Sequence, residues 1–162
     1  MGAAELRSTL TVIRALYWTI ATAGGLGLSP VAPGTMGTLG GVFLYLLLSR
    51  SSFPLYFFTL FVVILAGIWS AERVGRETGK KDSQKIVIDE VAGLLVTLLA
   101  ASGSLFSVIL GFLFFRLFDI WKPFPIRWSE GYFPGGLGVM IDDLMAGGYA
   151  CLGLWIFERW VL

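Results

Sequence analysis

Three charged side chains stand at the end of an otherwise apolar run near residue 120. Arg116 and Asp119 are three residues apart and therefore share one face of a helix, and Lys122 comes directly before Pro123. Proline disfavours helical backbone at the preceding residue, which predicts that the helix ends near Trp121. Two interpretations stay open: an ion pair that only neutralises the helix end, or a functional site, since charge at the edge of a membrane is costly without a purpose.

Four further carboxylates form two adjacent pairs, Asp89-Glu90 and Asp142-Asp143, each at the expected start of an apolar helix. Neighbours on a helix point about 100° apart, so one member of each pair would bind a metal while the other contacts water or a cation. Structural roles are open as well. Lys85 lies four residues before Asp89 and could pair with it, and acidic residues stabilise a helix N-terminus.

The composition indicates an integral membrane protein with a single domain over residues 1–162. Hydrophobic residues make up 56% of the chain and charged residues 14%, against roughly 25% charged in globular domains, and the mean hydropathy is +0.80. The formal net charge of +1 gives no indication of nucleic-acid binding. The chain has no histidine and one cysteine, Cys151, which excludes histidine chemistry, an internal disulfide and a thiolate metal cluster.

The apolar segments predict an all-α, polytopic membrane bundle of about six helices. Residues 1–22 have the spacing of an amphipathic helix that lies in the headgroup plane. The remaining helices are expected over residues 37–49, 55–71, 86–101, 105–121 and 138–158, after a loop that runs to about Met36. Basic residues concentrate between Glu72 and Lys85, which the positive-inside rule places in the cytoplasm: Arg73, Arg76, Lys80, Lys81 and Lys85.

This topology brings five carboxylates to the cytoplasmic ends of three helices: Asp89, Glu90, Asp119, Asp142 and Asp143. Like charges at one depth repel one another unless a cation lies between them. Oxygen ligands without histidine or thiolate favour Mg²⁺, with water and substrate phosphate completing its coordination shell. The sequence therefore predicts a magnesium site on the cytoplasmic side.

A glycine-rich loop is expected at the same level, and it offers phosphate-binding groups. Gly34 and Gly37 permit close approach of a ligand to backbone N–H groups at a helix N-terminus, and Thr35 and Thr38 add hydroxyls. The alternative is that Gly37 and Gly41 form a small-residue pair that lets two membrane helices touch.

Four segments resemble the motifs of the phosphatidylglycerophosphatase A family, in that family's order and over most of the chain: Pro33–Thr38, Ile88–Gly93, Phe115–Pro123 and Gly136–Asp143. The resemblance implies a mostly helical, Mg²⁺-dependent phosphatase of the bacterial inner membrane that converts phosphatidylglycerophosphate to phosphatidylglycerol and phosphate. By motif position it assigns function to all five carboxylates, with four polar companions: Thr35, Thr38, Arg116 and Lys122.

Elimination among phosphatase chemistries also leaves metal-assisted hydrolysis. Phe157 stands after Cys151 where a cysteine phosphatase has arginine, and the adjacent Asp142-Asp143 does not match the Asp-x-Asp of aspartyl-phosphate enzymes. We expect metal ligands at Asp89, Asp119 and Asp142. Glu90 or Asp143 would act as the base or support the ligands, and Arg116 or Lys122 would stabilise developing charge. A covalent aspartyl intermediate stays open beside direct attack by water.

Two other classes of protein are weighed against a phosphatase. A small transporter or channel would use buried carboxylates to pass a cation or proton, but it predicts acids spread across the membrane depth. The middles of the apolar segments carry none. A purely structural membrane subunit leaves the clustering of acidic residues unexplained.

Overall fold

The computed structural model describes residues 3–80, 83–129 and 132–160. Within these ranges the chain is helical and contains no strand, which confirms the all-α prediction. The helices, in chain order, are α1 (Ala3–Ala21), the 3₁₀ helix η1 (Leu26–Leu28), α2 (Pro33–Leu48), α3 (Phe53–Thr78), α4 (Ile88–Thr97), the 3₁₀ helix η2 (Leu98–Ala100), α5 (Leu105–Trp121), α6 (Ile126–Ser129) and α7 (Gly135–Trp160).

The bounds of α5 are those predicted from the sequence. Its C-terminal neighbour Lys122 has a φ of 45°, a left-handed conformation that stops the helix. The prediction of a loop as far as Met36 was wrong. Pro33 stands in the first turn of α2, where its fixed φ fits and its missing N–H is not needed, so the residues that follow it join the helix.

Three other predicted bounds were also wrong. The helix α3 continues past Ala71 to Thr78 and ends at Gly79, so the charged residues from Glu72 to Glu77 extend the helix, and the connection begins only after them. The helix α4 is shorter than predicted because its last turn tightens into η2. The last helix begins at Gly135 instead of Gly138, and the short α6 is an additional helix.

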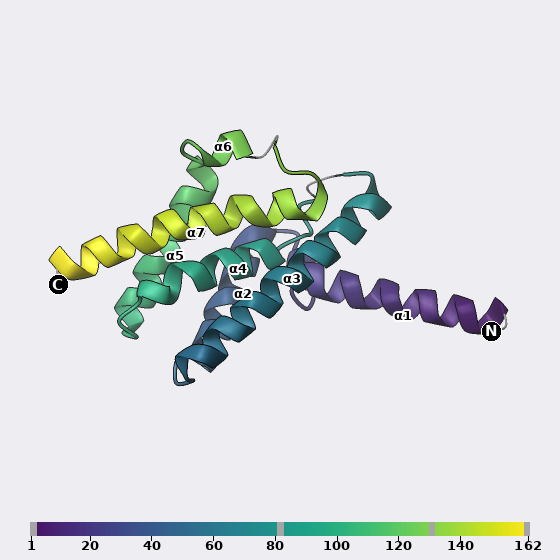
Figure 1. Cartoon of the computed structure of the whole chain (residues 1–162), viewed down its shortest axis with the longest axis horizontal. Coiled ribbons are helices and arrows are strands. Elements are labelled where there is room, and N and C mark those ends of the chain that lie inside the picture. The colour runs from purple at the N-terminus through teal and green to yellow at the C-terminus, as the bar shows by residue number, and fades with distance from the viewer. Residues whose placement is uncertain (1–2, 81–82, 130–131, 161–162) are drawn as a thin grey trace.

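The short helix α4 occupies the middle of the bundle and contacts α2, α3, α5 and α7 (Figure 1). Its side chains are buried on nearly all sides, with Ala92, Leu94 and Leu95 fully inaccessible. A helix that is apolar all round needs neighbours on every face, which explains why this ten-residue helix lies in the core.

Two helices are long and apolar enough to cross a membrane, α3 and α7, with 26 residues each. Large apolar side chains face outward on α3, including Phe57, Phe58 and Phe61. A continuous exposed apolar face of this kind suits contact with lipid.

The amphipathic helix α1 extends away from the bundle, so that the two ends of the chain lie at opposite ends of the molecule (Figure 1). Its exposed side chains include Leu10, Val12 and Leu16. It is tied to the end of α3 through Glu77, whose carboxylate accepts hydrogen bonds from Tyr17 (2.5 Å) and Trp18 (3.0 Å).

The helices α4 and α7 cross at two glycines. A Cβ atom on Gly147 would lie 2.3 Å from the carbonyl oxygen of Gly93, and a Cβ atom on Gly93 would lie 2.6 Å from the carbonyl oxygen of Asp143. Glycine at both positions therefore lets the two backbones meet directly, as small residues do in membrane helix packing.

This contact predicts different effects for two adjacent glycines of α7. Gly147→Ala should lower the melting temperature in detergent, because the added methyl group meets the rigid backbone of α4 and forces the helices apart. Gly148→Ala is the matched control, since a Cβ atom there would meet nothing within 4 Å. Thermal unfolding followed by circular dichroism checks this, and equal melting temperatures for the two variants would contradict the close crossing.

Candidate active site

Two helices bring three carboxylates together in the core of the bundle. Asp89 and Glu90 lie in the first turn of α4, and Asp143 comes from α7. One oxygen atom from each of these carboxylates lies within 4.8 Å of the other two. We call Asp89, Glu90 and Asp143 the acidic cluster.

The acidic cluster is shielded from water. Asp89 and Asp143 are buried, and Glu90 is half-buried. Glu90 Oε2 and Asp143 Oδ2 are buried and have no hydrogen-bond partner among the residues that the structure describes. Buried carboxylate oxygens that lack a hydrogen-bond partner strongly destabilise the folded protein unless a proton or a cation compensates their negative charge. Oxygen-only donors from three carboxylates therefore fit a hard divalent cation such as Mg²⁺.

Arg116 and Asp119 form the ion pair that their spacing indicated, and the pair lies beside the acidic cluster. The distance from Arg116 Nη1 to Asp119 Oδ2 is 2.5 Å, and both side chains are mostly buried. Asp119 acts electrostatically on both Glu90 and Asp143, and Arg116 acts on Glu90. The ion pair of the first interpretation is therefore present, and it lies at the candidate site of the second.

Asp142 makes different contacts from Asp143. Its Oδ1 accepts a hydrogen bond of 2.8 Å from Ser129 in α6, and its Oδ2 lies 3.9 Å from Lys122 Nζ. The sequence interpretation placed Asp142 among the ligands and Asp143 among the supporting residues, whereas the structure brings Asp143 into the cluster. Ser129 was not predicted, because its role depends on where α6 folds back and no local pattern indicates that.

The first turn of α2 lies against the site. A Cβ atom on Gly34 would lie 2.5 Å from Glu90 Oε1 and 3.3 Å from Arg116 Nη1, so glycine at this position lets both side chains lie against the backbone. Thr35 is half-buried in the same turn. The first N–H groups of a helix have no acceptor within the helix and are available to an anion.

The other two predicted loop residues have structural contacts. A Cβ atom on Gly37 would lie 2.6 Å from Val87 Cβ, which makes Gly37 a position of close packing. The hydroxyl of Thr38 is fully buried and donates a hydrogen bond of 2.9 Å to the carbonyl of Gly34. Gly34 is therefore the predicted substrate-binding residue that the structure places against the acidic cluster, whereas Gly37 and Thr38 have packing contacts.

Small residues also position the start of α4. The segment before α4 runs against Gly27, where a Cβ atom would lie 2.1 Å from the carbonyl oxygen of Lys85. The N–H of Val87 donates a hydrogen bond of 2.8 Å to the carbonyl of Ala21. Residues 85–87 are thus held between the end of α1 and the side of α2. This contact fixes the positions of Asp89 and Glu90 at the start of α4.

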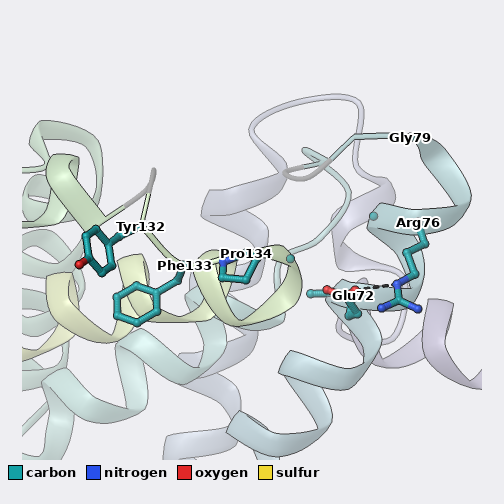
Figure 2. A pocket seen from close by; sticks show the side chains of 9 residues that line it. Glu72, Arg76, Gly79, Tyr132, Phe133 and Pro134 are labelled. Atoms are coloured by element: carbon teal, nitrogen blue, oxygen red, sulfur yellow. Dashed lines mark hydrogen bonds and ion pairs between the residues drawn. The ribbon is translucent and has the colours of Figure 1, made fainter.

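A separate pocket of about 630 Å³ lies between α3 and the segment that leads into α7 (Figure 2). Its charged side chains already have partners. Glu72 accepts hydrogen bonds from Arg76 Nε (2.6 Å) and from the N–H of Gly136 (2.8 Å). Because Glu72 caps the start of α7, we assign this pocket to the joint between two helices, and the acidic cluster remains the candidate site.

Comparison with known proteins identifies relatives over most of the chain. The family described as Phosphatidylglycerophosphatase A matches residues 19–158. Two relatives carry the same name: one from Escherichia coli K12 is 38% identical over 80% of this chain and 77% of its own length, and one from Haemophilus influenzae is 35% identical over 88% and 89%.

A third relative bears a different name. A protein from Bacteroides thetaiotaomicron, named as a candidate phosphatidylinositol-3-phosphatase, is 40% identical over 88% of this chain and 93% of its own length. No solved structure matches the chain. The family match covers the segments that form the acidic cluster, Arg116 and the first turn of α2, and the chain belongs to the phosphatidylglycerophosphatase A family.

Proposed function

We propose that this protein is a Mg²⁺-dependent lipid phosphatase that hydrolyses the phosphomonoester of phosphatidylglycerophosphate to give phosphatidylglycerol and phosphate. The family and two relatives supply the substrate. The third relative's name also specifies a phosphomonoester on a phospholipid head group. The observation that carries the proposal is the acidic cluster beside Arg116, since it joins a cation-binding oxygen set to a phosphate-binding guanidinium.

Asp89, Glu90 and Asp143 would hold the ion, which when bound polarises a phosphoryl oxygen and activates water. Arg116 is oriented by its ion pair with Asp119 and has further N–H groups to donate to the phosphoryl oxygens. The absence of a side chain at Gly34 lets the phosphate reach the N-terminus of α2.

Two acidic residues outside the cluster have distinct proposed roles. Asp119, which is paired with Arg116, would accept a proton from the attacking water. Asp142 holds Lys122 near the site, and the lysine ammonium then adds positive charge where the transition state becomes more negative.

We propose that the site faces the cytoplasm at the inner membrane of a bacterium. The acidic cluster lies at the start of α4, which follows shortly after the basic end of α3, and basic segments stay on the cytoplasmic side. A site at this level meets the head group of a lipid while its acyl chains remain in the leaflet. The same placement disfavours a channel, which needs carboxylates along the whole membrane depth.

The first activity prediction concerns the metal. Phosphate release from phosphatidylglycerophosphate by purified protein should stop in EDTA and return with excess Mg²⁺. Asp143→Asn should reduce turnover more than Asp142→Asn, because only Asp143 contributes to the acidic cluster. Binding of Mn²⁺, followed by electron paramagnetic resonance, should weaken in the same order. Full activity in the chelator would refute the metal proposal.

The second concerns the first turn of α2. Gly34→Ala should displace the flexible Glu90 side chain and lower turnover at least about tenfold, with little change in melting temperature. Thr35→Val should also lower turnover if its hydroxyl contacts phosphate. Gly41→Ala is the packing control: a Cβ atom there would lie 3.2 Å from the carbonyl oxygen of Val91, so stability should fall instead. Normal turnover in both Gly34→Ala and Thr35→Val would leave this turn a packing element.

The third concerns topology. In a Cys151→Ala background, single cysteines at Lys80 and Arg127 should react with an impermeant maleimide only from the cytoplasmic side, and one at Ser102 only from the other side. All three positions are exposed. Lys81, in the predicted cytoplasmic segment, lies outside the described residues, so Lys80 is used. Labelling of Lys80 and Arg127 from opposite sides would be incompatible with the proposed site.

A further inference from the structure

Two shallow hollows adjoin the C-terminal end of α5, next to the acidic cluster. The first has a volume of about 810 Å³ and is lined by Leu113, Arg116, Leu117, Ile120, Trp121 and Arg127. The second has a volume of about 530 Å³ and is lined by Trp121, Lys122, Pro123, Phe124, Arg127 and Trp128. Trp121 and Arg127 line both hollows, and we call the two hollows together the α5 groove.

The cations of the α5 groove differ in their partners. Arg116 pairs with Asp119, and Lys122 lies 3.9 Å from Asp142, so the acids of the candidate site partly neutralise both. Arg127 is exposed and forms no ion pair with any carboxylate in the part of the chain that the structure describes. Among the described residues, Arg127 thus adds to the groove a positive charge that no ion pair neutralises.

The rest of the α5 groove is apolar. Leu113, Leu117 and Ile120 follow one another at helical spacing along α5, and each exposes more than half of its surface, at 56%, 53% and 74%. Trp121 and Trp128 flank Arg127 and are also exposed. Exposed apolar residues on a helix suit acyl chains, and tryptophans are typical of the level where a membrane meets water.

We propose that Arg127 binds the phosphodiester of the lipid substrate, the phosphate that stays in the product, while the terminal phosphomonoester lies at the acidic cluster. This inference rests on the proposed function. Phosphatidylglycerophosphate has two anionic groups separated by glycerol. The α5 groove offers two cationic positions: Arg116, beside the acidic cluster, and Arg127, farther along the groove. A guanidinium can donate two parallel hydrogen bonds to a phosphate, and the apolar face of α5 then continues in the direction of the acyl chains.

The assignment makes Arg127 a specificity-determining residue. A lipid with a phosphodiester between its acyl chains and its phosphomonoester engages both positions, and this includes phosphorylated inositol lipids as well as phosphatidylglycerophosphate. Phosphatidic acid has a single phosphate attached directly to diacylglycerol. It can occupy the acidic cluster but leaves Arg127 without a ligand, so Arg127 should favour the first class of lipid over the second.

The test compares Arg127→Gln with Arg127→Lys and with Arg50→Gln, an exposed arginine in the turn after α2, at the other end of that helix from Gly34. Phosphate release is measured in mixed micelles with Mg²⁺ on phosphatidylglycerophosphate and on phosphatidic acid. Arg127→Gln should lower kcat/KM on the first lipid about 10-fold to 100-fold, mainly through KM, and leave phosphatidic acid unaffected. Arg127→Lys should recover part of the loss, and Arg50→Gln should match the wild type.

A second measurement needs no turnover. Short-chain phosphatidylglycerol carries the phosphodiester without the phosphomonoester, so it should raise the melting temperature of the wild type and of Arg50→Gln, and raise that of Arg127→Gln much less. Equal stabilisation of all three proteins, or equal losses on both substrates, would overturn the role of Arg127. A wild type that binds this lipid through Arg127 but releases no phosphate would instead overturn the proposed function and leave the binding site intact.

Discussion

The direct contact between the backbones of α4 and α7 brings like charges together inside the bundle. With glycine at 93 and 147 the two helices approach until Asp143 on one lies beside Asp89 and Glu90 on the other, with oxygen atoms within 4.8 Å. Three carboxylates in a poorly solvated place repel one another, and no gain in apolar packing requires them there. This electrostatic cost is the strongest physical reason to expect a cation at this point.

The surrounding residues moderate that cost without removing it. Arg116 pairs with Asp119, and Lys122 lies near Asp142, so these two acids have cationic neighbours. Glu90 and Asp143 each retain a buried oxygen without a hydrogen-bond partner in the described chain. Positive charge thus lies around a negative centre. This is the arrangement expected of a site that must accept both a divalent cation and a phosphate group.

The arrangement of the helices suits a lipid substrate. The core helix α4 is short and starts at the acidic cluster, while α3 and α7 are long enough to cross a membrane. The exposed apolar face of α5 includes residues on both sides of Arg116, namely Leu113, Leu117 and Ile120. A lipid can therefore present its head group to the cluster while its chains remain beside the protein, and no cavity deep enough to enclose the whole molecule is needed.

The helical class, the end of α5 before a proline and the five candidate acids follow from the amino-acid sequence. Composition and proline geometry do not depend on how the helices pack, so residue types and their spacing are enough to predict these features. The packing of the helices shows that Asp143 rather than Asp142 joins Asp89 and Glu90, and that Gly34 touches Glu90. Adjacent residues on a helix point about 100° apart, so the rotation of the helix about its axis decides which of them faces the site. Glycine contacts with the other helices set that rotation.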